Sequence, residues 1–186
     1  MSACPEISIA MDFAPLAIAT SNSTIKEIAT KLLSSIGYDS WIFACDNPDS
    51  IFGMSHLMSG VPFQWVTTYL AKGYKNIDPI FKHCRESDEP LYWDATFGWD
   101  DAENKIKTFM RDLHACGFGS GFAIPLRSLS GKLGILSIVN AQPLKQKEQS
   151  YLQNTASARA IGIALHSAME RIASKQPFPE AGSLPM

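Results

Sequence analysis

Aromatic and polar side chains concentrate in one stretch of a chain that is otherwise rich in aliphatic residues. Indole and phenol groups are large, rigid walls that each carry one hydrogen-bonding group, and an ionised carboxylate only accepts hydrogen bonds. Such a set suits a pocket that buries an apolar ligand and orients a few of its polar atoms. The alternative is that the rings fill a core and the carboxylate caps a helix. The residues concerned are Trp65, Tyr69, Tyr74, Asp78, Tyr92, Trp93 and Trp99.

Catalytic chemistry has little support in the same sequence. His83 and Cys84 are adjacent, and neighbouring residues on a helix do not face each other, so they make a poor base and nucleophile. The other histidines, His56, His114 and His166, have no H-x-x-x-H spacing for a metal. The sequence therefore predicts no enzyme.

The cysteines are widely spaced and form no C-x-x-C pair that would indicate a zinc or redox site. We expect small buried thiols in a reducing cytoplasm, and neither a metal nor another cofactor. The four are Cys4, Cys45, Cys84 and Cys116.

Composition and charge limit the class of protein. The chain has 186 residues, of which 46% are hydrophobic and 18% charged, which fits one domain with a sizeable core. A net charge of -2, without a block of basic residues, indicates that this chain alone does not bind nucleic acid. No stretch approaches the roughly 18 consecutive apolar residues needed to cross a bilayer. We expect a soluble cytoplasmic protein that does not bind membranes.

Capping and turn residues predict the elements that position the aromatic group. A T-x-x-E capping box of Thr24 and Glu27 precedes a helix that ends at Gly37, and the apolar runs 38–45 and 51–58 are typical of a hairpin. A short helix over 62–72 should carry Trp65 and Tyr69 on one face. Asp78 followed by Pro79 is typical of an N-cap that opens a second short helix. Further on we predict a strand over 90–93, followed by a helix capped by Asp100 and Glu103. The last elements are a hairpin of strands 121–127 and 133–140 with a turn at Gly131, and a long helix over 145–173.

This order of elements predicts an α/β (α+β) fold, an α-β-α sandwich in which helices cover both faces of an antiparallel sheet of about five strands. Small-molecule sensor modules of the GAF and PAS kind have this architecture. The chain divides into an N-terminal arm over 1–23, a folded domain over 24–173 and a Pro-rich linker over 174–186.

Three motifs combine into a specific pattern: W-x3-Y-x8-D-P over 65–79, P-L-Y-W over 90–93, and the spacing of small residues over 117–137. This pattern resembles the N-terminal autoinducer-binding domain of LuxR-type quorum-sensing transcriptional regulators, over about residues 24–172. The resemblance implies a regulator that binds an acyl-homoserine lactone signal in a buried pocket, and no catalytic role.

The resemblance also implies a role for each polar residue. Trp65 would donate its indole N–H to the lactone carbonyl, and Asp78 would accept the amide N–H of the ligand. Ser137 would bond near the acyl carbonyl or a 3-oxo group, while Tyr69 and Trp93 would wall the lactone ring. The acyl chain would run among residues that are equally plausible as plain core, namely Ile42, Ala44, Ile80, Phe109, Leu113, Phe118, Ala123 and Leu136.

Two positions depart from the family pattern. Many members have a Tyr four residues before the Trp, where its hydroxyl meets the acyl carbonyl, but this chain has Val61 there, and Val66 follows the Trp. Losing one neutral hydrogen bond costs about 0.5–1.5 kcal/mol. Either Ser137 alone or a group such as His56 compensates for it.

Full-length members of the family carry a C-terminal helix-turn-helix domain, which these 186 residues do not contain. We expect a piece of a longer regulator that homodimerises and reaches DNA only through that domain. One alternative is a natural protein that lacks the DNA-binding half and forms inactive heterodimers. Another is an enzyme such as a lactone hydrolase that acts near Cys84 or Asp78.

Overall fold

Helices and strands follow one another as the sequence predicts from the second helix onward. The computed structural model describes residues 12–46, 54–96, 98–129, 131–141 and 148–174. The elements are α1 (Ala14–Ile18), α2 (Asn22–Ser35), β1 (Trp41–Asp46), β2 (Met54–Ser59), α3 (Phe63–Ala71), the 3-10 turn η1 (Tyr74–Asn76), α4 (Pro79–Glu86), β3 (Leu91–Asp94), α5 (Asn104–Ala115), β4 (Ser120–Arg127), β5 (Leu133–Asn140) and α6 (Glu148–Ala173).

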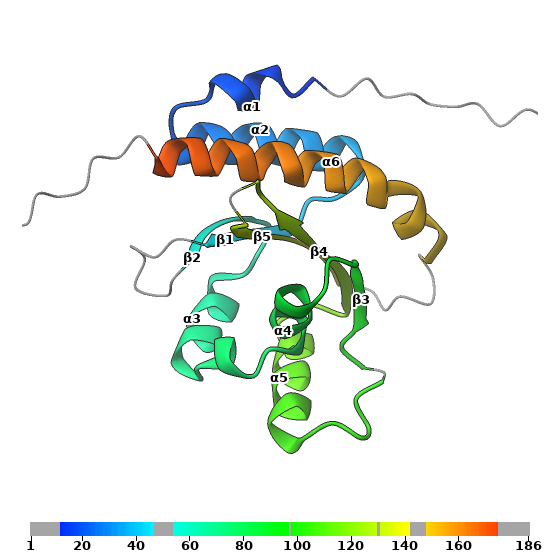
Figure 1. Cartoon of the computed structure of the whole chain (residues 1–186). Helices are drawn as coiled ribbons and strands as arrows, with labels where there is room; N and C mark the ends of the chain where they lie inside the picture. Colours follow the sequence, from blue (N-terminus) through cyan, green and yellow to red (C-terminus); the bar gives the residue numbers. More distant parts are fainter. Residues whose placement is uncertain (1–11, 47–53, 97, 130, 142–147, 175–186) are drawn as a thin grey trace, which may run out of the picture.

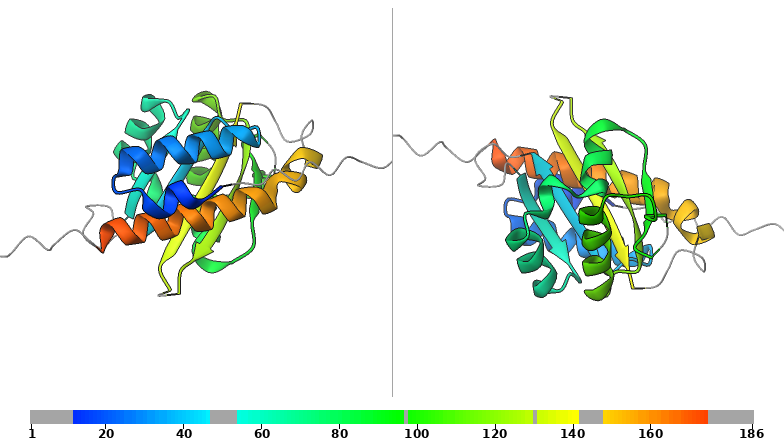
Figure 2. Two further views of the ribbon diagram at one scale, coloured as in Figure 1. Left: turned by 90° about the horizontal axis from the view of Figure 1, so that it is seen from above. Right: turned by 90° about the horizontal axis from the view of Figure 1, so that it is seen from below.

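The five strands form one antiparallel sheet in the order β2-β1-β5-β4-β3. Helices α1, α2 and α6 lie across one face, and α3, α4 and α5 lie against the other (Figures 1 and 2). The predicted α-β-α sandwich is therefore confirmed. Both predicted hairpins are present, although the turn of the first one falls within 47–53, outside the described residues.

One face of the sheet is closed by a tightly filled core. Successive strand residues point to opposite faces, and the residues on this face are the larger ones. They include Trp41, Phe43, Phe122, Leu136 and Ile138, all fully buried beneath α2 and α6. This layer of large, fully buried side chains supports the sheet.

Two predicted helix caps are wrong. The N-cap of α2 is Ser21, whose hydroxyl accepts the backbone N–H of Thr24 at 3.2 Å, so the helix begins three residues before the predicted capping box. The N-cap of α5 is Glu103, without a side-chain cap, and Asp100 lies in the preceding turn. In both cases the predicted cap lies about one turn away from the observed one. A periodic apolar pattern indicates that a helix is present but defines its first residue poorly.

Helix α1 falls within the segment predicted as an arm. Its buried residue Leu16 packs in the core beside α6. The Arg171 guanidinium on α6 donates to the backbone carbonyls of Leu16 and Ala19, at 2.7 Å each. Because these partners are more than 150 positions apart in the sequence, no local pattern could indicate that α1 docks there.

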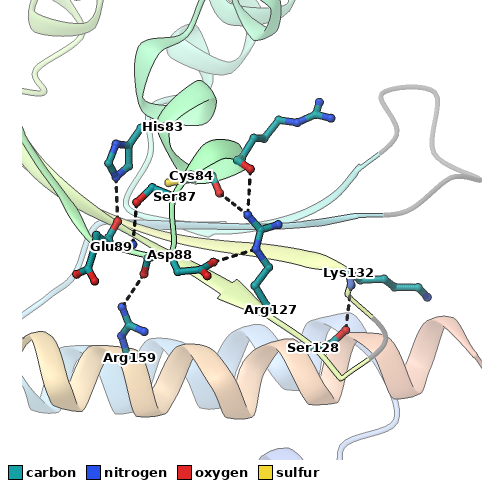
Figure 3. Close-up of polar contacts among 10 residues, drawn as sticks. His83, Cys84, Ser87, Asp88, Glu89, Arg127, Ser128, Lys132 and Arg159 are labelled. Atoms are coloured by element: carbon teal, nitrogen blue, oxygen red, sulfur yellow. Dashed lines mark hydrogen bonds and ion pairs between the residues drawn. The ribbon is translucent and has the colours of Figure 1, made fainter.

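Helix α4, which carries part of the site described below, is anchored at its C-terminus by two arginines (Figure 3). Arg127, the last residue of β4, donates to the carbonyls of Cys84 and Arg85 at 3.3 and 3.0 Å, and its Nε pairs with Asp88 at 3.0 Å. Arg159 of α6 donates to the Asp88 carbonyl at 3.1 Å. The end of α4 is thereby joined to the sheet and to the helical layer on the opposite face.

Candidate ligand-binding site

A cavity of about 490 Å³ lies between the sheet and the α3–α5 layer. Its walls come from β1, β2, β5 and β3 on the sheet side and from α3, η1, α4 and α5 on the other side. The lining residues are Ile42, Ala44, His56, Val61, Trp65, Val66, Tyr69, Leu70, Gly73, Lys75, Asn76, Asp78, Ile80, Phe81, Trp93, Phe109, Leu113, Phe118, Ile135, Ser137 and Val139. Its size and its mainly apolar lining with a few polar groups are typical of a small-molecule site.

Helix α3 presents the first two aromatic residues to this cavity. Pro62 precedes the helix in an extended conformation, and Gly73 closes it with φ of +62°, which favours glycine. Trp65 and Tyr69 lie one turn apart, with ring centroids 5.7 Å apart and an edge-to-face geometry. The predicted helix and the shared face are both confirmed.

Asp78 is the acidic group of the cavity, and it also caps α4. Its Oδ1 accepts the backbone N–H groups of Ile80 and Phe81 at 2.8 and 3.1 Å, and Pro79 occupies the first turn. Its Oδ2 accepts the Tyr69 hydroxyl at 2.9 Å. A carboxylate offers about four acceptor positions, so these three bonds leave capacity for one further donor.

Burial raises the pKa of Asp78 to about 6, against the opposing effect of the three hydrogen bonds that favour its charged form. Burial and the neighbouring Asp78 charge also raise the pKa of the Tyr69 phenol, which stays a hydrogen-bond donor. At neutral pH the cavity therefore holds one carboxylate, and a ligand N–H is its natural additional partner.

Apart from Trp93 on β3, the sheet wall of the cavity is built from small or medium residues. Ser137 lies opposite Ile42 in the β1–β5 pair, and His56 lies opposite Ala44 in the β1–β2 pair. His56 and Ser137 are thus separated by a whole strand and offset along it, so they face different parts of the cavity. Desolvation, followed by the charge of Lys75, lowers the pKa of His56.

Trp93 closes one end of the wall, with 3% of its surface exposed. Its ring packs where a side chain at Gly121 would lie, because a Cβ on that glycine would overlap the indole. Its Nε1 is buried and has no hydrogen-bond partner among the described residues. Trp93 therefore borders the cavity, and its role as a wall for the lactone ring stays a prediction.

The structure brings almost all of the predicted site residues together around this cavity. The exceptions are Ala123 and Leu136, which the cavity lining does not include. Leu136 points to the opposite face and belongs to the core under α6. The sequence contained a signal that would have avoided this error, because side chains alternate between the two faces along β5. If Ser137 faces the cavity, then Ile135 and Val139 also face it and Leu136 does not.

Other lining residues had no clear signal in the sequence. Leu70, Gly73, Lys75, Asn76 and Phe81 border the cavity because α3, η1 and α4 fold over it. Their residue types are equally typical of exposed turns and helix surfaces. Only the placement of these segments over the sheet makes them part of the site.

The His83–Cys84 pair does not have the geometry of a nucleophile and its base. His83 Nε2 donates to the Glu89 carbonyl at 2.9 Å, whereas the Cys84 side chain is fully buried, which raises the pKa of its thiol to about 12. Cys45 and Cys116 form no disulfide within the described part of the chain, and Cys4 lies outside it. Within the described part of the chain, no group of three or more His, Cys, Asp and Glu side chains could hold a metal ion, and no helix is long and apolar enough to span a membrane.

The sandwich and its partly polar cavity define a small-molecule sensor domain. Residues 21–169 match the sequence profile of the family described as "Autoinducer binding domain", and the chain belongs to that family, the autoinducer-binding domains of LuxR-type transcriptional regulators. It is 25% identical over 156 residues to the transcriptional activator AnoR of Acinetobacter nosocomialis. The match covers 83% of this chain and 63% of AnoR, so the chain spans less than two thirds of that relative.

Solved structures share the fold. CepR2 from Burkholderia cenocepacia, described as an N-acylhomoserine lactone dependent LuxR family transcription factor, has a TM-score of 0.71 at 21% identity, covering 88% of this chain and 94% of that chain. The GAF3 domain of Slr1393 from Synechocystis has a TM-score of 0.52 at 13% identity, covering 84% of this chain and all (100%) of that one. The second likeness confirms the predicted relationship to GAF-type sensor folds.

Proposed function

We propose that this domain binds an N-acyl homoserine lactone in the cavity under α3, α4 and α5, as the ligand-binding part of a transcriptional regulator. The observation that carries the proposal is the buried carboxylate of Asp78, which keeps a free acceptor position beside an indole donor in an otherwise apolar cavity. An amide-linked lactone offers one N–H, several carbonyl oxygens and an apolar tail, which matches those three kinds of group.

Each polar residue has one role in this proposal. Trp65 donates its indole N–H to the lactone carbonyl, and Asp78 accepts the amide N–H in a charge-assisted bond. Ser137 donates to the acyl carbonyl or to a 3-oxo group. Tyr69 and Trp93 wall the lactone ring, and Tyr69 also holds Asp78 in place through its hydroxyl.

The acyl chain lies along the apolar part of the cavity, where each buried CH₂ contributes about 0.8 kcal/mol. Val61 lines the cavity without a hydroxyl, so the acyl carbonyl loses one family hydrogen bond. In this proposal Ser137 replaces this bond. The strand register supports Ser137 over His56, because Ser137 lies opposite Ile42 and His56 lies opposite Ala44, two residues further along β1. The chain-lining residues are Ile42, Ala44, Val61, Ile80, Phe109, Leu113 and Phe118.

Binding stabilises the folded state by RT ln(1 + [L]/Kd) and favours a homodimer of the regulator in the cytoplasm. In this proposal the regulator contacts DNA through a C-terminal helix-turn-helix domain, as the family resemblance implies; the match covers 63% of the transcriptional activator AnoR. The domain described here has no basic surface block of its own in its sequence.

A thermal-unfolding series tests the proposal directly. Acyl-homoserine lactones with tails of four to fourteen carbons are added to the protein, and at least one should raise Tm in a concentration-dependent manner. The ring-opened acyl homoserine of the same tail is the control and should raise Tm less. Absence of a shift across the whole series would contradict the proposal. Mass spectrometry of the lactone after incubation separates binding from hydrolysis, and intact ligand is expected.

A further inference from the structure

The indole of Trp65 is surrounded by rings, and one of them lies nearly parallel to it. The Tyr74 ring stacks on Trp65 with centroids 6.1 Å apart and an angle of 29° between the planes. The other neighbours, Tyr69, Phe109 and Phe118, meet it at 60–83°. An edge contact limits sliding of the indole, whereas the stacked ring fixes the plane in which its N–H points.

Tyr74 is itself fixed by a bond that reaches out of the cavity. Its ring is 3% exposed and is absent from the cavity lining, so it does not touch the volume available to a ligand. Its hydroxyl donates to Asp112 Oδ2 on α5 at 2.6 Å, and its ring meets Phe109 of the same helix edge-on. Two contacts with α5 therefore hold the Tyr74 ring, in addition to its contacts with Trp65 and Tyr69.

Asp112 receives a second donor at the same oxygen, the Lys72 ammonium group at the end of α3. These two donors hold the pKa of Asp112 below its ordinary value. The Lys72 side chain is 51% exposed, and an ion pair of this kind adds little to stability. The short bond from Tyr74 to a carboxylate is the directional contact, since charge-assisted bonds of this type are both shorter and stronger than neutral ones.

We propose that Asp112 and Tyr74 are positioning residues for recognition of the lactone head group: Asp112 fixes Tyr74, and Tyr74 holds the Trp65 indole in the orientation in which it donates to the lactone carbonyl. The inference rests on the proposed function. Neither residue touches the ligand, so both act only through Trp65. The chain Asp112–Tyr74–Trp65 joins α5, η1 and α3 across the outer side of the cavity.

The test compares two ligands with the same acyl tail, an N-acyl homoserine lactone and the N-acyl cyclopentylamide, which lacks the lactone oxygens. Tyr74→Phe keeps the stacked ring and removes its hydroxyl, and Asp112→Asn removes the charge that accepts it. Each variant should weaken binding of the lactone by about threefold, no more than deletion of the Trp65 donor itself, because only part of one hydrogen bond is lost. Binding of the cyclopentylamide should change by less than about twofold. The double variant should resemble Tyr74→Phe alone, because both changes break one interaction.

Tyr92→Phe is the matched control. Tyr92 is also part-buried, and its hydroxyl bonds Thr155 at 2.8 Å, on the side of the sheet away from the cavity. This variant should leave the preference for the lactone over the cyclopentylamide unchanged. If Tyr74→Phe and Asp112→Asn weaken both ligands equally, or only lower Tm as Tyr92→Phe does, the positioning role is wrong.

Failure of the proposed function gives a different result. If the wild-type protein binds neither ligand, both the proposed function and the positioning role are wrong. If the wild-type protein prefers the lactone and the variants keep that preference, only the positioning role is wrong. Should Tyr74→Phe not fold, Asp112→Asn carries the same comparison, because the Asp112 side chain is 18% exposed. If neither variant folds, the link is structural and the proposal is overturned.

Discussion

The two faces of the sheet differ in the size of the side chains that they present. Toward α2 and α6 the strands present Trp41, Phe43 and Phe122, which are fully buried in the core. Toward α3, α4 and α5 they present smaller groups apart from Trp93, among them Ala44 and Ser137, and the volume that these leave open is the cavity. Aromatic rings then wall that volume from the helical side. One face therefore stabilises the domain, and the other keeps room for a ligand.

The first way to test this contrast is to shorten a leucine on each face. Leu165 on α6 is fully buried, so Leu165→Ala should lower the free energy of unfolding by about 2–5 kcal/mol. Leu113 borders the cavity, where the surroundings are already incompletely packed, so Leu113→Ala should cost about 2 kcal/mol, near the lower limit of that range. Urea unfolding measures both values. Leu113→Ala should also shift ligand preference toward a bulkier tail, and equal costs without such a shift would remove the contrast.

The second test uses the titration of Asp78. Its pKa is about 6 in the folded protein and 3.8 in its unperturbed state, so the folded state binds the proton more tightly. Protonated Asp78 therefore contributes its full stabilisation below about pH 4. As the pH rises from about 4 to about 6 and Asp78 ionises, the free energy of unfolding falls by roughly 3 kcal/mol. The difference in unfolding free energy between wild type and Asp78→Asn, measured from pH 4 to 7, isolates this effect. Ligand affinity should rise over the same interval, because the ionised carboxylate is the better acceptor; a flat difference would show that Asp78 titrates normally.

The third test separates the two roles of Asp78. Asp78→Ala removes the cap of α4 and should cost about 1 kcal/mol of stability. It should weaken lactone binding by about 1.5–3 kcal/mol, or about tenfold to 150-fold, through loss of a charge-assisted bond. Asp78→Asn keeps a capping oxygen and should lower affinity with little loss of the cap. Equal affinities of all three proteins, measured by calorimetry, would leave Asp78 with the capping role alone.

The fourth test fills the open face. Ala44 lines the cavity from β1, and Ala44→Leu extends an apolar side chain into it. Binding of the lactone should weaken by at least about tenfold, which corresponds to about 1.4 kcal/mol. The free energy of unfolding should change by less than about 1.5 kcal/mol, because the larger side chain can occupy the cavity. Cys45→Leu on the opposite face of the same strand is the control, and overpacking there should cost about 1–3 kcal/mol without a selective effect on the ligand.

The smallest effect is expected from Trp65→Phe. This change keeps an aromatic wall and deletes the indole donor, so affinity for the lactone should fall by about 0.5–1.5 kcal/mol. The cyclopentylamide with the same tail should bind both proteins alike. A loss of equal size with both ligands would mean that Trp65 contributes shape and not a hydrogen bond.

Local patterns were sufficient for much of the fold. Apolar runs predicted both hairpins, and Asp78 with Pro79 predicted the start of α4. Gly131 predicted the turn of the second hairpin, and its φ is positive in the structure. These features depend on neighbours a few residues apart, which the sequence displays directly. Helix starts were predicted less accurately, and the caps assigned to α2 and α5 were wrong by one turn, although α2 has a side-chain cap at Ser21.

The sequence by itself determined which residues could recognise a polar head group, because Trp65, Tyr69 and Asp78 carry their chemistry and spacing in one motif. Only the tertiary structure decided which other residues surround the cavity: Leu136 lies in the core on the opposite face of the sheet, while Lys75 and Phe81 border the cavity. The link from Asp112 to Tyr74 joins residues 38 positions apart and has no local signature. The reason is physical, since a cavity is space that several distant segments leave between them, and no single segment encodes it.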